Sequence, residues 1–148
     1  MFHHVLVATD GSALANKGLG YGASIAKRDQ AKLTVVTVTP QWSALDIAHD
    51  VRQGQPDPIA QYEQLAAAGA NRLLADAVVR CKNEGVACTT VHVKDQHPAE
   101  GIVATARDLG CDLIVMASHG RRGIARMTLG SQTNDVLAHS SVPVLVVR

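Results

Sequence analysis

The chain of 148 residues has few aromatic side chains and almost no net charge. Aromatic residues make up 3% of it, and 14 Lys and Arg against 13 Asp and Glu give a formal net charge of +1. Proteins that bind single-stranded nucleic acid depend on aromatic stacking platforms, and nucleic-acid-binding domains usually carry a strong basic field. We therefore expect no nucleic acid among its partners, and any cationic function must be local.

Cysteines and long apolar runs are also scarce. The chain has three cysteines, Cys81, Cys88 and Cys111, without C-x-x-C spacing, which is typical of thiols in a reducing compartment. The start "MFHHVLVATD" lacks the basic and long apolar segments of a signal peptide, and the run "VPVLVV" is far shorter than a bilayer span. These features predict a cytoplasmic protein without a membrane partner. The length predicts a single domain over residues 1–148.

Five short runs rich in Val, Ile and Thr predict β-strands. The runs are His3–Thr9, Lys32–Val38, Val86–Val93, Cys111–Ala117 and Pro143–Val147. The second, fourth and fifth are nearly continuous apolar runs, as expected of strands that helices cover on both faces.

The segments between these runs have helical periodicity. The first helix follows a possible cap at Ser12 and carries the stripe Leu14, Gly18, Tyr21, Gly22 and Ile25. Further helices are predicted from Pro58 to about Asn83, from Pro98 to Gly110, and from a cap at Ser131 to about His139. Residues 39–58 are predicted to be an irregular loop over the strand ends. The alternation of strands and helices predicts an α/β fold, a doubly wound parallel sheet with helices on both faces.

The polar, glycine-bearing segments follow the first and fourth predicted strands. "ATDGS" (residues 8–12) ends the first, and "SHGRRGIARMTLGS" (residues 118–131) follows the fourth. In doubly wound folds, ligands bind beyond the carboxyl ends of the strands where the chain order reverses. Glycines, the Ser131 hydroxyl and free N–H groups at a helix start would together form an anion site. Simpler interpretations stay open: Asp10 as a turn residue, Ser131 as a cap, and Arg121, Arg122 and Arg126 as a solvated loop.

The segments "VLVATDGS" and "DLIVMASHGRRGIARMTLGSQTNDVLAHSSVPVLVVR" resemble the universal stress protein family, in the expected order and over essentially the whole chain. Nucleotide-binding members of that family carry the pattern G-x2-G-x9-G followed by Ser or Thr. Here Gly120, nine residues, Gly130 and Ser131 match the second half, and Ala117 stands at the first glycine. The resemblance implies a five-stranded Rossmann-like sheet in the order 3-2-1-4-5.

The resemblance also implies a site for an adenine nucleotide, ATP or AMP. The adenine end would be held by Ala8, Thr9, Asp10 and Val38; the ribose and α-phosphate by Met116, Ala117, His119 and Gly120; the outer phosphates by Gly130, Ser131, Gln132 and Thr133. An Mg²⁺ or Mn²⁺ ion would bind with the phosphates, although the sequence shows no carboxylate cluster for a metal site. The resemblance further implies a homodimer, since the last strand, Val144 to Val147, would lie at the edge of the sheet.

Three functions from different classes follow. The first is a stress-response protein that binds the nucleotide as a sensor or regulator. The second is an interaction protein of the same fold without useful nucleotide affinity, which Ala117 favours. The third is a slow ATP hydrolase, but we expect no catalytic residues: there is no G-x-S-x-G, and Ser118 and His119 are only adjacent in sequence. We expect no protein metal site either, because His3 and His4 would point to opposite faces of a strand.

Overall fold

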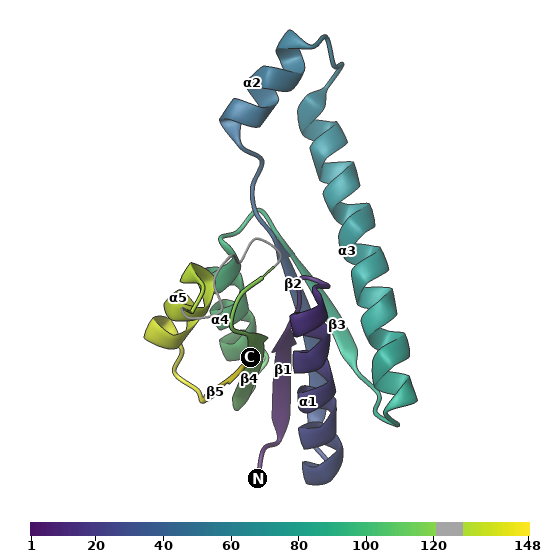
Figure 1. Ribbon diagram of the computed structural model, residues 1–148, viewed down its shortest axis with the longest axis vertical. Helices are drawn as coiled ribbons and strands as arrows, with labels where there is room; N and C mark the ends of the chain where they lie inside the picture. Colours follow the sequence, from purple (N-terminus) through teal and green to yellow (C-terminus); the bar gives the residue numbers. More distant parts are fainter. Residues whose placement is uncertain (121–128) are drawn as a thin grey trace.

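The computed structural model describes residues 1–120 and 129–148, and in them a five-stranded parallel sheet has the order β3-β2-β1-β4-β5 (Figure 1). The strands are β1 (His4–Ala8), β2 (Lys32–Thr39), β3 (Thr89–Lys94), β4 (Leu113–Ala117) and β5 (Val144–Val147). The helices are α1 (Ala13–Asp29), α2 (Ala44–Arg52), α3 (Pro58–Asn83), α4 (Pro98–Asp108) and α5 (Ser131–His139). The doubly wound fold and the predicted strand order are confirmed.

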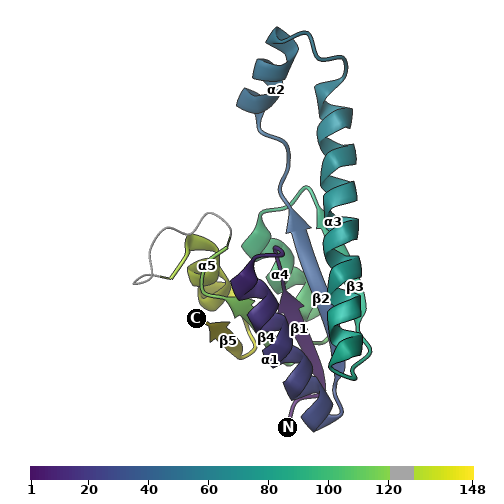
Figure 2. The ribbon, with the colours of Figure 1, turned by 45° about the vertical axis from the view of Figure 1, so that its right-hand side comes forward.

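Helices cover the sheet on both faces and form two separate apolar cores. Alternate side chains of a strand point to opposite faces, so Val5 and Val7 of β1 pack with α1 and α3, whereas Leu6 packs with α4 and α5. Figure 2 shows α1 and α3 together on one side of the sheet and α4 on the other. The central strands are therefore enclosed between two layers of helices.

Helix α1 begins as the sequence predicts, and four of the five residues of the predicted stripe face the core: Gly18 and Gly22 are buried, and Leu14 and Ile25 pack against the buried residues. The Ser12 hydroxyl accepts a hydrogen bond from the Ala15 N–H at 3.2 Å, which confirms the predicted cap. The prediction that Tyr21 faces the core is wrong, because this residue is 50% exposed. The helix lies close to the sheet at Gly22, where an added Cβ would collide with a methyl group of Val7. A tyrosine does not fit in such a close contact, so small side chains take the buried positions.

The predicted loop over residues 39–58 is wrong, because it contains helix α2. No residue of α2 is buried, and Leu45 and Val51 are 81% and 58% exposed. Its apolar residues therefore do not form the buried stripe by which helices are recognised in a sequence. In Figure 1, α2 and the first turns of α3 project beyond the end of β2, away from the sheet. The Tyr62 hydroxyl donates to the carbonyl of Pro40 at 2.8 Å and joins α3 to the start of this projection.

Strand β5 lies at the edge of the sheet and pairs in parallel with β4. The prediction that helices cover it on both faces is wrong for part of its length, since Leu145 is 36% exposed while Val147 is buried. Within residues 1–120 and 129–148, no helix combines the length and the apolar composition needed to cross a membrane.

Candidate ligand-binding site

A cavity of about 590 Å³, here called the α4/α5 cavity, lies at the carboxyl ends of β1 and β4. The chain order of the sheet reverses between these two strands, and doubly wound folds bind ligands at that point. All twelve residues that the sequence analysis selected line this cavity: Ala8, Thr9, Asp10, Val38, Met116, Ala117, His119, Gly120, Gly130, Ser131, Gln132 and Thr133. Segments far apart in the chain therefore meet around one space.

Four further lining residues were missed: Ala15, Val36, Pro98 and Ile102. The sequence contained a signal for some of them. Val36 precedes Val38 by two positions, so both side chains lie on one face of β2. Pro98 opens a helix that follows a strand end, so its first turn must lie near the carboxyl edge of the sheet.

Part of the lining of the α4/α5 cavity is apolar. Val36 is fully buried, and Ile102 and Met116 are each 6% exposed. These side chains come from β2, α4 and β4, and they stay in place because each also belongs to the buried core on this face. Such a wall can hold a flat apolar ring system without a polar partner.

A further part of the lining is formed by the start of α5. Gly130 occupies the cap position with φ of −63° and has no side chain to cap the helix, so the predicted cap at Ser131 is wrong and Ser131 is the first helical residue. No described group accepts a hydrogen bond from the N–H groups of Ser131, Gln132 or Thr133. Helices α1 and α3, by contrast, have side-chain caps from Ser12 and Asp57. Unsatisfied N–H groups at a helix start form a site for an anion.

The side chains of Gln132 and Thr133 hold this helix start in place. The Thr133 hydroxyl, 3.1 Å from the carbonyl oxygen of Ala117 and 3.0 Å from that of Ser118, can donate to either. Oε1 of Gln132 accepts from the N–H of Ala99 at 3.0 Å, which also caps α4. The two side chains thus fix α5 against β4 and α4, and leave their backbone N–H groups for a ligand.

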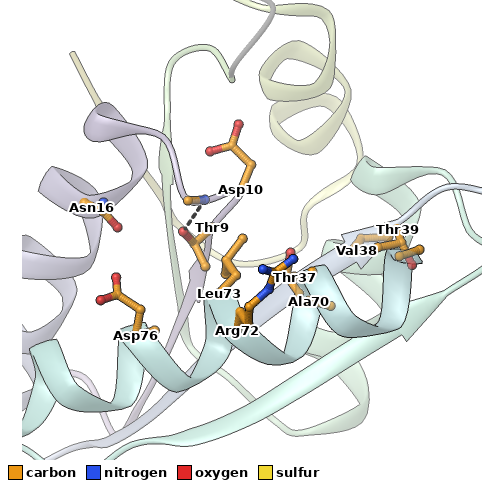
Figure 3. Close-up of a pocket in the computed structure, with 14 residues that line it drawn as sticks. Thr9, Asp10, Asn16, Thr37, Val38, Thr39, Ala70, Arg72, Leu73 and Asp76 are labelled. Carbon is orange, nitrogen blue, oxygen red and sulfur yellow. Dashed lines mark hydrogen bonds between the residues drawn. The ribbon is translucent and has the colours of Figure 1, made fainter. Parts of the chain in front are cut away.

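The two motif glycines permit close approaches. A Cβ at Gly120 would lie 2.7 Å from Oδ2 of Asp10, and a Cβ at Gly130 would lie 3.3 Å from the carbonyl oxygen of Ser118. Oδ1 of Asp10 accepts from the Ser12 N–H at 3.0 Å, and in Figure 3 the Asp10 carboxylate points away from α3. Gly120 thus lets the segment after β4 approach the end of β1, and Gly130 lets the start of α5 approach the end of β4.

Ala117 occupies the position of the first glycine in the motif, and its backbone conformation does not require glycine. It is the last residue of β4, pairs with Val147 of β5, and is not among the described residues with positive φ. Ala117 is 8% exposed and lines the cavity. The substitution therefore changes the lining of the cavity and not the course of the chain.

Ser118 and His119 are more than sequence neighbours. The Ser118 hydroxyl and Nδ1 of His119 are hydrogen-bonded at 3.0 Å, and Ser118 is 3% exposed. Among the described residues, no carboxylate binds the His119 ring to orient it as a general base.

The described residues contain no group of three or more His, Cys, Asp or Glu side chains placed to hold a metal ion. Arg121, Arg122 and Arg126, for which a solvated loop was the simpler interpretation, lie outside the described residues.

Comparison with known proteins identifies relatives that span the chain. The universal stress protein family matches residues 1–148. Universal stress protein YxiE of Bacillus subtilis is 32% identical over 152 residues, which cover 100% of both chains. The solved structure of universal stress protein UspA from Lactobacillus plantarum has a TM-score of 0.81 at 24% identity, over 99% of this chain and 97% of that one. A universal stress protein solved in complex with cAMP has a TM-score of 0.70 at 26% identity, over 99% and 97%.

Proposed function

This chain belongs to the universal stress protein family, and on that premise we propose that it binds an adenine nucleotide, ATP or AMP, in the α4/α5 cavity and acts as a stress sensor or regulator. The observation that carries the proposal is that the lining of one cavity combines apolar side chains with an uncapped helix start. An apolar wall and an uncapped helix start lie around one space, as the base and the phosphates of a nucleotide require. The relative solved with cAMP supports an adenine nucleotide as the ligand.

In this proposal the base packs against Val36, Val38 and Ile102, near the ends of β1 and β2. The ribose and first phosphate lie beside Ala117 and Gly120, where the close approach of the strand ends brings backbone groups near the ligand. The outer phosphates accept hydrogen bonds from the N–H groups at the start of α5. The helix dipole adds a favourable charge interaction at that position.

A divalent ion, Mg²⁺ or Mn²⁺, would be held mainly by the phosphate oxygens. The described residues supply no cluster of carboxylates for it, and oxygen-rich ligands are what these ions prefer. We therefore propose that the protein binds the nucleotide and not a metal ion by itself. Titration with MgCl₂ alone should show no binding.

Calorimetric titration of nucleotide-free protein tests the function directly. We expect ATP and AMP each to bind at one site per chain, and denatured samples of freshly purified protein to release adenine nucleotide. GTP is the control, since it has the same phosphates and a different base. Absence of binding by both ATP and AMP at millimolar concentration would overturn the proposal and favour an interaction protein of the same fold.

We also propose a homodimer through β5, because an apolar edge strand with unpaired backbone groups favours pairing with a second copy. Its residues Val144 to Val147 are all apolar, and Leu145 remains 36% exposed at the edge. Antiparallel pairing with the same strand of another copy would satisfy the open backbone groups and form a closed two-fold interface.

A cytoplasmic location is the last part of the proposal. All three cysteines are free thiols, and burial raises the pKa of Cys81 to about 12 and that of Cys111 to about 11. These two thiols stay protonated and unreactive at neutral pH. Cell fractionation should recover the protein with cytoplasmic markers.

A further inference from the structure

A second cavity of about 560 Å³, here called the α1/α3 cavity, lies on the opposite face of the sheet (Figure 3). Its lining comes from the ends of β1 and β2, from α1 and from the middle of α3: Thr9, Asp10, Gly11, Asn16, Thr37, Val38, Thr39, Ala66, Gly69, Ala70, Arg72, Leu73, Asp76 and Ala77. Thr9, Asp10 and Val38 line both cavities. Asn16, Arg72 and Asp76 line only this one.

The volume exists because α3 presents small side chains toward the sheet. Ala66, Gly69 and Ala70 follow one another at helical spacing on its inner face. A Cβ at Gly69 would meet no atom within 4 Å, so the space in front of that residue is open. Leu73 and Val38 supply the apolar part of the lining.

The charged groups of the cavity are not neutralised by one another. Arg72 and Asp76 are one helical turn apart, within reach of an ion pair, yet Oδ2 of Asp76 binds Nε of Arg80 at 2.6 Å. No hydrogen bond or ion pair within residues 1–120 and 129–148 engages the guanidinium of Arg72. The Arg80 pair is half exposed on both sides, so Asp76 keeps acceptor capacity for a second donor. In the view of Figure 3, Asp76 of α3 points toward Asn16 of α1.

The third charged residue of the lining is Asp10, which also lines the α4/α5 cavity. The Asp10 carboxylate accepts from the Ser12 N–H and lies against Gly120, and Figure 3 shows it directed away from α3. The α1/α3 cavity is left with one guanidinium and one carboxylate. A phosphate or a dicarboxylate would match Arg72 but would be repelled by Asp76, whereas a molecule with one charge of each sign matches both.

We propose that the α1/α3 cavity binds a free aliphatic α-amino acid. Arg72 holds its carboxylate through the paired N–H groups of the guanidinium, Asp76 and Asn16 accept from its ammonium group, and the side chain packs on Leu73 and Val38. The proposal does not rest on nucleotide binding, because these three polar side chains do not line the α4/α5 cavity.

The experiment is calorimetric titration of the full chain with L-leucine, compared with three probes that each lack one feature. We expect L-leucine to bind at one site per chain. Leucinol, which lacks the carboxylate, 4-methylpentanoate, which lacks the ammonium group, and inorganic phosphate should each bind at least about tenfold more weakly. Equal binding of 4-methylpentanoate or phosphate would show an anion site and overturn the proposal, and so would the absence of L-leucine binding.

Variants assign the binding to this cavity. Arg72→Met should weaken the binding of L-leucine by about tenfold or more, because the substitution keeps the aliphatic stem and removes the charge. Gly69→Leu should abolish binding by filling the open space, while the better helix propensity of leucine keeps α3 folded. Gly20→Leu is the matched control, since Gly20 also lies in a helix with no atom near an added Cβ and lines neither cavity. Unchanged binding in both Arg72→Met and Gly69→Leu would place the ligand elsewhere and refute the assignment.

Discussion

Replacing Ser131 with alanine separates a ligand contact from a structural cap. Ser131 is the first residue of α5, the cap position belongs to Gly130, and the Ser131 hydroxyl makes no hydrogen bond to a described residue. Removing this hydroxyl therefore costs the fold no described contact. Ser12 is the matched contrast, since its hydroxyl does cap α1 by accepting from the N–H of Ala15 at 3.2 Å.

The two substitutions should affect different properties, ligand affinity and thermal stability. A hydrogen bond to a charged phosphate contributes about 1.5–3 kcal/mol. Ser131→Ala should therefore weaken the binding of ATP roughly 10- to 150-fold and leave the Tm unchanged. Loss of an N-cap costs about 1 kcal/mol, so Ser12→Ala should lower the Tm by about 2–4 °C in a domain of this size. In Ser131→Ala, the affinity for AMP should fall less than the affinity for ATP, because the single phosphate of AMP would lie further from α5.

Titration calorimetry with ATP and AMP measures the first effect, and thermal melting without nucleotide measures the second. The reasoning is refuted if Ser131→Ala binds ATP within about twofold of the wild type, since the hydroxyl then does not contact a phosphate. A fall in Tm for Ser131→Ala equal to that of Ser12→Ala would show that the hydroxyl caps the helix after all.

The remaining predictions concern the strand ends, acid stability and assembly. Gly120→Ala should weaken the binding of ATP and of AMP by similar factors in calorimetry, because a Cβ 2.7 Å from Oδ2 of Asp10 must displace that carboxylate. Asp29→Asn should lower the Tm at neutral pH, and the difference should shrink as the pH falls from about 3.8 toward about 2. The hydrogen bond from Arg28 lowers the pKa of Asp29 to about 2 in the fold, so the stabilising charge is present above pH 3.8 and is lost below. Leu145→Lys should shift the protein from dimer to monomer in sedimentation velocity, because a charge on an edge strand opposes pairing.

Each of these has a control on the same chain. Gly20→Ala should leave the binding of both nucleotides unchanged. Asp108→Asn should lower the Tm at neutral pH less than Asp29→Asn does, because the Asp108 side chain is 65% exposed and that of Asp29 is 6% exposed. Leu137→Lys should stay dimeric, since Leu137 is 42% exposed on α5 and not on the edge strand. A loss of affinity for ATP alone in Gly120→Ala would contradict the argument about the strand ends. A Tm difference between Asp29→Asn and the wild type that persists at pH 2 would contradict the argument about acid stability. A wild type that sediments as a monomer would contradict the proposed dimer.

Much of the site was predictable because its residues are neighbours of strand ends in the sequence. "ATDGS" and "ASHG" each follow an apolar run, and all parallel strands end at the same edge of the sheet. The match to the G-x2-G-x9-G pattern located the start of α5, and Ser12, Pro58 and Pro98 marked helix starts that the structure confirms. Caps and apolar periods act within a few residues, so a sequence displays them without any knowledge of the fold.

Other features depend on contacts between elements. Helix α2 was missed because it buries none of its residues, and Tyr21 was misplaced because the close contact of Gly22 with Val7 decides which side of α1 faces the sheet. Ser131 lost its predicted cap role to Gly130.

The α1/α3 cavity shows the difference most clearly. Asn16 and Arg72 are distant in the sequence, on helices whose local patterns give no sign that they line one space. Their proximity follows from how α1 and α3 pack on the sheet, and the open volume from the small side chains that α3 presents there. The sequence by itself determined the strands, most of the helices and the motifs at the strand ends, because local interactions specify them. Only the tertiary structure decided which side chains share a cavity, because that depends on packing distances between elements far apart in the chain.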